Sequence, residues 1–212
     1  ERYGIEKGEA RRMDLYTQFA IAAAAQAAQD SGIEGAFDPQ RLGVYVGSGI
    51  GGMTTFMAEH EKLLSRGPGR VSPLFIPMMI ANIAAGNIAI RYGANGPCLP
   101  VVTACATSTH TVGEAYRAIR YGYADAILAG GAEATINPLA VAGFANMKAL
   151  TEAQDPQAAS LPFDRRRAGF VMGEGAGILV LEELEHALKR GAKIYCEVVG
   201  YVNTRDAHHI TA

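Results

Sequence analysis

The sequence has few cysteines, little net charge and no long apolar run, and each shortage narrows the class of protein. Three cysteines, an odd number, argue against a disulfide framework and favour a reducing compartment, which we expect to be the cytoplasm. The formal net charge is -2 at pH 7, so neither nucleic acid nor an anionic membrane is expected as the main partner. Residues 19–28 are alanine-rich and interrupted by Gln26, and they fall short of the roughly 20 apolar residues that a membrane span needs.

The two ends of the chain suggest that further residues flank it. Glu1 is not an initiator methionine, and no succession of basic, apolar and small residues typical of a signal peptide follows it. The sequence stops at Ala212 without a tail or a closing helix. We therefore expect this sequence to be part of a longer protein, incomplete at both ends.

Apolar runs and helix-forming stretches alternate along the chain. With 49% hydrophobic residues the chain can bury a substantial core. Short apolar strands separated by helices are typical of a layered α/β fold whose strands are covered on both faces. The expected helices are residues 9–31, 54–65, 78–92, 104–122, 138–144 and 183–189. The expected strands and short apolar segments are residues 42–46, 98–103, 126–129, 177–181 and 194–201.

Cys105 stands where an expected strand gives way to a helix. Its sulfur should lie beside the first unpaired N–H groups of that helix, where the helix dipole stabilises an anion and favours the reactive thiolate. Ala104 and Ala106 are small and leave access for a substrate. Position alone leaves a second interpretation open, because a free cysteine is commonly a small buried apolar residue. Cys98 and Cys196, inside strand patterns, fit that second interpretation better.

Three motifs carry a resemblance to a known family. Residues 103–108 read Thr-Ala-Cys-Ala-Thr-Ser, residues 130–133 read Gly-Gly-Ala-Glu, and residues 162–177 read PFDRRRAGFVMGEGAG. Together they resemble the elongating condensing enzymes of fatty acid synthesis, the β-ketoacyl-acyl-carrier-protein synthases I and II, and synthase II in particular. Ala168 stands where an acidic residue is frequent in that family. The resemblance extends over essentially the whole chain.

The resemblance implies a thiolase-like fold, built from two similar α/β halves in αβαβα layers. Residues 1–212 would be the N-terminal β-ketoacyl synthase domain, mainly the first half of that fold. The C-terminal half is absent from this sequence. In the family it supplies two catalytic histidines, a lysine and a glycine-rich segment with a gating phenylalanine. We therefore expect this chain to be inactive by itself.

The resemblance also implies the reaction of an acyltransferase. The Cys105 thiolate would take an acyl chain from a carrier-protein thioester, and a decarboxylative Claisen condensation with malonyl carrier protein would follow. Backbone N–H groups, one being that of Cys105, would form the oxyanion hole. The protein would need no cofactor and no metal, because its substrates are carried on the phosphopantetheine of acyl carrier protein.

A glycine-rich loop and an aromatic residue are implied to shape the acyl pocket of a homodimer. Ile50, in the loop 47–52, would lie near the dimer interface and project toward the far end of the partner's pocket, and Phe144 would be a pocket-wall aromatic. Plain core packing is the alternative for both. A dinucleotide loop is disfavoured at 47–52, because the third glycine comes one residue too early and no acidic ribose ligand follows at the expected distance.

Basic residues are implied to dock the acidic acyl carrier protein. Arg11 and Arg12 lie at the expected start of the first helix. Positive charge opposes the helix dipole there, so their presence needs another explanation. A solvated charged face is the alternative for each residue. The implied docking residues are Arg11, Arg12, Arg66, Arg70 and Lys148.

Three other functions stay open on the sequence. A polyketide ketosynthase or a thiolase would be related enzymes, although Ala-Thr-Ser after Cys105 favours the fatty acid branch. Intermediates bound to coenzyme A would instead mark a thiolase. A non-catalytic acyl-binding or chain-length partner subunit usually lacks the nucleophile, whereas Cys105 is present.

Overall fold

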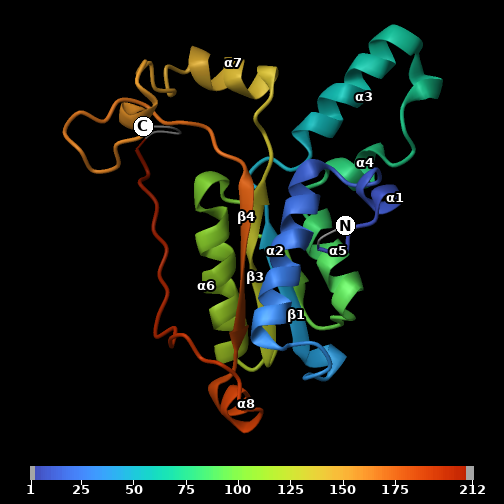
Figure 1. Cartoon of the computed structure of the whole chain (residues 1–212), viewed down its shortest axis with the longest axis vertical. Helices are drawn as coiled ribbons and strands as arrows, with labels where there is room; N and C mark the ends of the chain where they lie inside the picture. The colour runs from blue at the N-terminus through green and yellow to red at the C-terminus, as the bar shows by residue number, and fades with distance from the viewer. Residues whose placement is uncertain (1–2, 209–212) are drawn as a thin grey trace.

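A four-stranded sheet with the strand order β2-β1-β3-β4 organises the computed structural model, which describes residues 3–208 (Figure 1). β1 pairs in parallel with β2 and β3, whereas β4 runs antiparallel to β3. The carboxyl ends of β1 and β3 therefore meet at one edge of the sheet. The strands are β1 Leu42–Gly47, β2 Cys98–Leu99, β3 Ala126–Glu133 and β4 Gly175–Glu182.

Helices cover both faces of this sheet. Alternate residues of a strand point to opposite faces, so Val44 and Leu128 pack with α2 and α5 while Tyr45 and Ile127 pack with α6. α3 and α7 project beyond the carboxyl ends of β1 and β3, and α8 lies at the opposite end (Figure 1). The helices are α1 Lys7–Ala10, α2 Leu15–Ser31, α3 Met53–Arg66, α4 Phe75–Met79, α5 Ile83–Tyr92, α6 Thr107–Arg120, α7 Pro138–Asn146 and α8 Leu184–Lys189.

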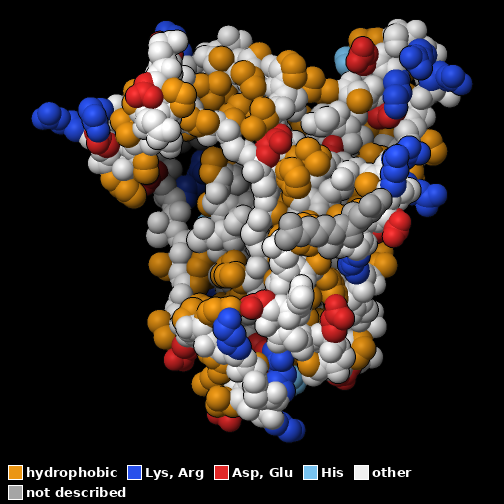
Figure 2. Space-filling view, viewed as in Figure 1, with side chains coloured by type: hydrophobic (Ala, Val, Ile, Leu, Met, Phe, Trp, Pro, Cys, Tyr) orange, Lys and Arg blue, Asp and Glu red, His pale blue; other side chains and the backbone are white. Residues whose placement is uncertain are grey.

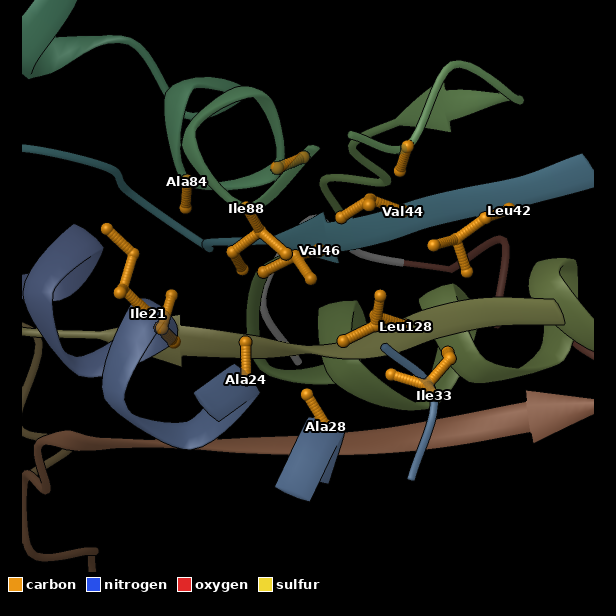
Figure 3. Packing of buried hydrophobic residues seen from close by; sticks show 14 of the residues in the cluster. Ile21, Ala24, Ala28, Ile33, Leu42, Val44, Val46, Ala84, Ile88 and Leu128 are labelled. Atoms are coloured by element: carbon orange, nitrogen blue, oxygen red, sulfur yellow. The ribbon is translucent and has the colours of Figure 1, made fainter. Parts of the chain in front are cut away.

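The larger core lies between α2, α5 and the sheet (Figure 3). Tyr16, Ala20, Ala24 and Ala28 recur every four residues along α2, and all are buried. This stripe consists mostly of alanine, so the helix can approach the sheet closely. Figure 3 shows Ala24 and Ala28 beside Leu128 of β3, and burying that leucine contributes about 2 kcal/mol.

The expected continuous helix over residues 9–31 is wrong, because the chain turns between α1 and α2. Asp14 marks the start of the second helix. Its carboxylate accepts from the Tyr16 N–H at 3.3 Å, which caps α2. It also accepts from the backbone N–H and the hydroxyl of Thr55 in α3, at 2.9 and 2.6 Å. The second pair of bonds joins segments 41 residues apart and is invisible to sequence periodicity.

The expected helix over residues 78–92 is also two helices, α4 and α5. The Tyr16 hydroxyl donates to the Ile80 carbonyl at 2.7 Å, and the Gly52 N–H donates to the Met79 carbonyl at 2.9 Å. These contacts fix the chain at the break between the helices. Burial raises the pKa of Tyr16 to about 12, so its hydroxyl stays protonated and can donate at neutral pH.

Three expected strands need correction. β2 covers only the first two residues of 98–103, because Pro100 follows and has no N–H to donate to the sheet. β4 is exposed along much of its length, with Leu179 58% exposed, so helices do not cover both of its faces. Residues 194–201 form no strand within the described part of the chain, where they lie largely exposed. The Tyr116 hydroxyl donates to the Val199 carbonyl at 3.2 Å, so this segment follows α6 instead.

The layered α/β class is confirmed, and the expected helices at 54–65, 138–144 and 183–189 correspond to α3, α7 and α8. Over residues 3–208, no helix combines the length and the apolar character needed to cross a bilayer.

Candidate active site

Cys105 lies in a tight turn between the end of the sheet and α6. The turn is the 3-10 segment Ala104–Ala106, and Ala104 has a φ of 51°. A residue with a Cβ adopts this left-handed conformation only where its surroundings hold it there. The Thr103 N–H donates to Oγ1 of the buried Thr107 at 2.8 Å and closes the turn. The cysteine is exposed and lies two residues before the first residue of α6, at the helix end that favours an anion.

Glycines at the ends of β1 and β3 let α6 begin this close to the sheet. Gly47 and Gly131 are partners in the parallel pair of strands. A Cβ on Gly131 would fall on the Ser108 hydroxyl, and a Cβ on Gly47 would fall on the methyl group of Thr107. Any side chain at either position would therefore push the start of α6, and the adjoining Cys105, away from the sheet.

An open cavity of about 480 Å³ lies beside Cys105. Residues 47–50, the end of β3, Phe144 and parts of residues 170–177 also line it. The structure thus brings the expected nucleophile together with both expected pocket residues. Ile50 is 46% exposed and lines the cavity of its own chain, whereas the resemblance implied a place in a partner's pocket.

Phe144 is held in the cavity wall by a second aromatic residue. The rings of Phe144 and Phe170 meet edge to face, with centroids 5.2 Å apart and planes at 81°. The Phe170 N–H donates to the Ala149 carbonyl at 2.9 Å, which fixes the second ring relative to the end of α7. Sequence reasoning did not single out Phe170, although it lies inside the motif at 162–177.

Sequence reasoning also missed Glu133, the last residue of β3. Its Oε1 accepts from the Ser48 hydroxyl at 3.0 Å, and its Oε2 accepts from the Gly49 N–H at 2.9 Å. Burial raises the pKa of Glu133, and these hydrogen bonds oppose the rise. The only sequence signal was its place at the end of the Gly-Gly-Ala-Glu motif.

The other two cysteines do not share the geometry of Cys105. Cys98 and Cys196 are both exposed, so the expectation that they are buried is wrong. Cys98 pairs with Val44 at the edge of the sheet, and desolvation by its neighbours raises the pKa of its thiol even though the residue as a whole is exposed. Its thiolate is correspondingly scarce. Among the described residues that line the cavity, Cys105 supplies the thiol.

Comparison with known proteins assigns this arrangement to a family. The family described as "Beta-ketoacyl synthase, N-terminal domain" matches residues 1–187. The chain belongs to the β-ketoacyl synthase family. A 3-oxoacyl-acyl-carrier-protein synthase 2 of Staphylococcus aureus is 52% identical over 209 residues, which are 98% of this chain and 52% of that protein. Its namesake in Vibrio cholerae serotype O1 is 51% identical over 214 residues, 100% of this chain and 51% of that protein.

The chain spans about half the length of the curated relatives it matches. Solved structures of β-ketoacyl synthases agree in fold. A β-ketoacyl synthase from Burkholderia phymatum has a TM-score of 0.88 and 33% sequence identity. The match covers 98% of this chain and 52% of the Burkholderia chain. A chain from the complex of a type II polyketide acyl-carrier protein with its ketosynthase has a TM-score of 0.83 and 36% identity, covering 92% and 50%. These matches confirm the thiolase-like class; the full αβαβα stack needs a second half and stays a prediction.

The expected docking residues of this β-ketoacyl synthase chain fall in two places. Arg11 is the C-cap of the short helix α1, and α2 begins only at Leu15, so Arg11 does not lie in the first turn of a helix as expected. Arg12 follows it, while Arg66 ends α3 and Arg70 ends the next turn. Figure 2 shows basic side chains gathered on the side where α1 and α3 lie. Lys148 follows α7, across the molecule from α3 in Figure 1. All five are exposed, and none forms an ion pair within residues 3–208.

A buried carboxylate fixes the turn that carries Arg70. Glu59 of α3 accepts from the Lys62 ammonium and, at 2.7 Å, from the Ser72 N–H just beyond that turn. The hydrogen bond from Lys62 and then that from Ser72 lower the pKa of Glu59. The ionised carboxylate therefore ties α3 to the turn and limits the positions that Arg70 can take.

Proposed function

We propose that the full-length protein containing this chain is an elongating 3-oxoacyl-acyl-carrier-protein synthase of type II, with Cys105 as its acyl-accepting nucleophile. One observation carries the proposal: Cys105, in its strained turn before α6, opens onto the cavity lined by Ile50 and Phe144. This chain would be the N-terminal half of that enzyme. The identity of 52% to a synthase 2 over nearly the whole chain supports this choice.

In the first stage, the Cys105 thiolate attacks the carbonyl carbon of an acyl thioester on the carrier protein. A carbon–sulfur bond forms and an electron pair moves onto the carbonyl oxygen, where backbone N–H groups, that of Cys105 included, stabilise the oxyanion. Collapse restores the carbonyl and expels the carrier thiolate. The alkyl chain then occupies the cavity, whose lining by Ile50 and Phe144 is suited to an apolar ligand.

In the second stage, malonyl carrier protein loses carbon dioxide, and the resulting carbanion attacks the carbonyl of the Cys105 thioester. A carbon–carbon bond forms, the bond to sulfur breaks, and the 3-ketoacyl product leaves on the carrier. The second half of the protein would supply the histidines and the lysine that polarise the malonyl thioester. In this scheme the reaction needs no cofactor and no metal from the protein.

Acyl carrier protein is the proposed partner, a homodimer the proposed assembly and the cytoplasm the proposed location. The exposed cations of α1, α3 and their turns suit an acidic partner. A related ketosynthase is known in complex with its acyl-carrier protein. Phe56 and Leu64 of α3 are 45% and 74% exposed and give that helix an apolar surface that a second copy would cover. The free thiols suit a reducing compartment.

Intact-mass measurement on the full-length protein tests the nucleophile. After incubation with acyl carrier protein, the wild type should gain the mass of one acyl group, and Cys105→Ala should gain none. Cys98→Ala and Cys196→Ala are matched controls that should acylate normally. Acylation of Cys105→Ala, with loss in either control variant, would refute the assignment.

A polyketide ketosynthase is the second candidate, because the ketosynthase of the type II polyketide complex shares the fold. The ishigamide ketosynthase/chain length factor shares it as well, with a TM-score of 0.78 and 36% identity over 89% of this chain. Products distinguish the candidates. A synthase of fatty acid elongation performs one condensation per loaded chain, whereas a polyketide enzyme would extend the unreduced product again. Acylation by coenzyme A thioesters in preference to carrier-bound ones would point to a thiolase.

A further inference from the structure

The loop that carries Ile50 begins where the pairing between β1 and β3 stops. The last paired residues of the ladder are Gly47 and Gly131. Beyond that point the segments that follow β1 and β3 separate, and the backbone N–H groups of the loop have no strand partner. Ile50 therefore sits on a segment whose position must be fixed by something other than the sheet.

Glu133 supplies this fixation from the end of β3. Its two carboxylate oxygens accept from the Ser48 hydroxyl at 3.0 Å and from the Gly49 N–H at 2.9 Å. The Ser48 oxygen in turn accepts from the Gly51 N–H at 2.8 Å. Both neighbours of Ile50 are thus tied to one carboxylate, directly at Gly49 and through the serine at Gly51.

The glycines on either side of Ile50 lie close to neighbouring segments of the chain. A Cβ on Gly49 would stand 2.8 Å from the Glu133 carboxylate and 3.3 Å from the Ala104 carbonyl, so the loop lies between the carboxylate and the turn of the nucleophile. Gly51 has a φ of 80°, and its Cβ would stand 2.7 Å from the Met79 carbonyl. The glycines around Ile50 are explained by these close approaches.

The Glu133 carboxylate is itself held and points at the loop. Glu133 pairs with Gly175 in the β3–β4 ladder, which fixes its backbone. Its hydrogen-bond partner Ser48 is buried and only 1% exposed. Within residues 3–208 the carboxylate has no ion-pair partner, so its stabilisation rests on hydrogen bonds. Both oxygens face the loop, an arrangement that suits positioning rather than proton transfer to a substrate.

We propose that Glu133 is a positioning residue for chain-length selection, which acts by holding Ile50 in the wall of the acyl cavity through Ser48 and Gly49. This inference rests on the proposed function, because it presupposes that the cavity receives the acyl chain. Loosening the loop lets Ile50 yield to a longer chain. The ratio of the kcat/KM for long primers to that for short primers should then rise.

The test measures elongation by the full-length protein with primers of graded length. Glu133→Gln keeps the shape but offers a single acceptor oxygen, and Ser48→Ala cuts the relay to Gly51 without touching the carboxylate. Each should raise the ratio by about fivefold or more, as expected for the loss of a buried hydrogen bond. Glu183→Gln is the matched control. The Glu183 carboxylate also accepts a backbone N–H, that of His186 at 2.8 Å, but it lies at the start of α8, at the far end of the sheet.

A double variant decides whether Glu133 acts through Ile50. In an Ile50→Ala background, Glu133→Gln should leave the length profile unchanged, since the side chain being positioned is gone. Equal slowing of all primers by Glu133→Gln and by Ser48→Ala, with the ratio unchanged, would overturn the inference. If the wild type elongates no primer, the proposed function fails instead. Should Glu133→Gln unfold, the ratio measured for Ser48→Ala decides.

Discussion

The backbone N–H of Thr103 and Oγ1 of Thr107 lie 2.8 Å apart, and their hydrogen bond spans the turn that contains Cys105. Thr107 is buried, whereas the cysteine between the two threonines is exposed. A single internal bond therefore helps hold the exposed cysteine in a backbone conformation that includes the positive φ of Ala104. The geometry of this turn therefore depends in part on Thr107, which also lines the cavity beside Cys105.

Replacing Thr107 by Val should loosen the turn at nearly constant side-chain volume. The Thr103 N–H would lose its acceptor, which should lower the free energy of unfolding by about 1 to 3 kcal/mol and slow acylation of Cys105. Thr107→Ser, which keeps the oxygen, is the control and should acylate close to the wild-type rate. Urea denaturation and the rate of mass gain measure the two effects. Equal acylation rates in the Val and Ser variants would contradict this role.

Replacing Ile50 by Phe should shorten the acyl chains that the enzyme accepts. The added volume faces the cavity beside Cys105, and overpacking costs about 1 to 3 kcal/mol, so long primers should be excluded while short ones still react. Elongation by the full-length protein with primers of graded length is the measurement. If short and long primers slowed equally, Ile50 would support the fold or the proposed dimer rather than limit chain length.

Charge reversal at Arg70 and Lys148 should weaken encounter with acyl carrier protein. Both side chains are exposed, so their attraction for an acidic partner acts mainly on the association rate and is screened by salt. The double variant Arg70→Glu/Lys148→Glu should slow association more than dissociation. Lys189→Glu, an exposed reversal in α8 at the opposite end of the sheet, is the control. An association rate that does not change over a tenfold range of salt would remove the electrostatic account.

Glu182 should make the stability of the fold depend on pH. Its side chain is 8% exposed and accepts from two nitrogens of Arg190, at 2.7 and 2.6 Å, while His186 lies 2.7 Å away. Burial opposes ionisation, but the hydrogen bonds from Arg190 and His186 outweigh it and lower the pKa of Glu182. A lowered folded-state pKa means that the stabilisation is present above the unfolded-state pKa and is lost as the pH falls through the folded-state value.

Glu182→Gln should therefore lower the free energy of unfolding at neutral pH by about 1 to 3 kcal/mol, and the difference from wild type should shrink as the medium is acidified. Urea denaturation over a range of pH measures it. Glu114→Gln removes an exposed pair with Arg117 and should change stability by less than about 1 kcal/mol. A difference that stays constant from neutral to acid pH would show that ionisation of Glu182 is not the cause.

Local chemistry determined much of what the sequence predicted correctly. The apolar run before the glycine loop became β1, the helix before Gly32 ended there with a φ of 61°, and Pro138 began α7. Each follows from a few neighbouring residues, namely the period of apolar side chains, a glycine that accepts the left-handed conformation, or a proline suited to the first helical turn. The place of Cys105 at a corner before a helix was predicted in the same way, whereas its role as nucleophile came from the resemblance and stays a prediction.

Tertiary contacts decided what the local pattern could not. Asp14 caps the start of α2 and is held there by Thr55, 41 positions away, and residues 194–201 form no strand in the described part of the chain although their side chains favour one. Ile50 is 55 positions from Cys105 in the sequence, and the parallel pairing of β1 with β2 brings the segments that follow these two strands to one cavity. The Glu133 carboxylate meets the loop of Ile50 because β3 pairs in parallel with β1. Capping and periodicity act within a few residues, whereas a cavity forms from side chains that the folded sheet brings together.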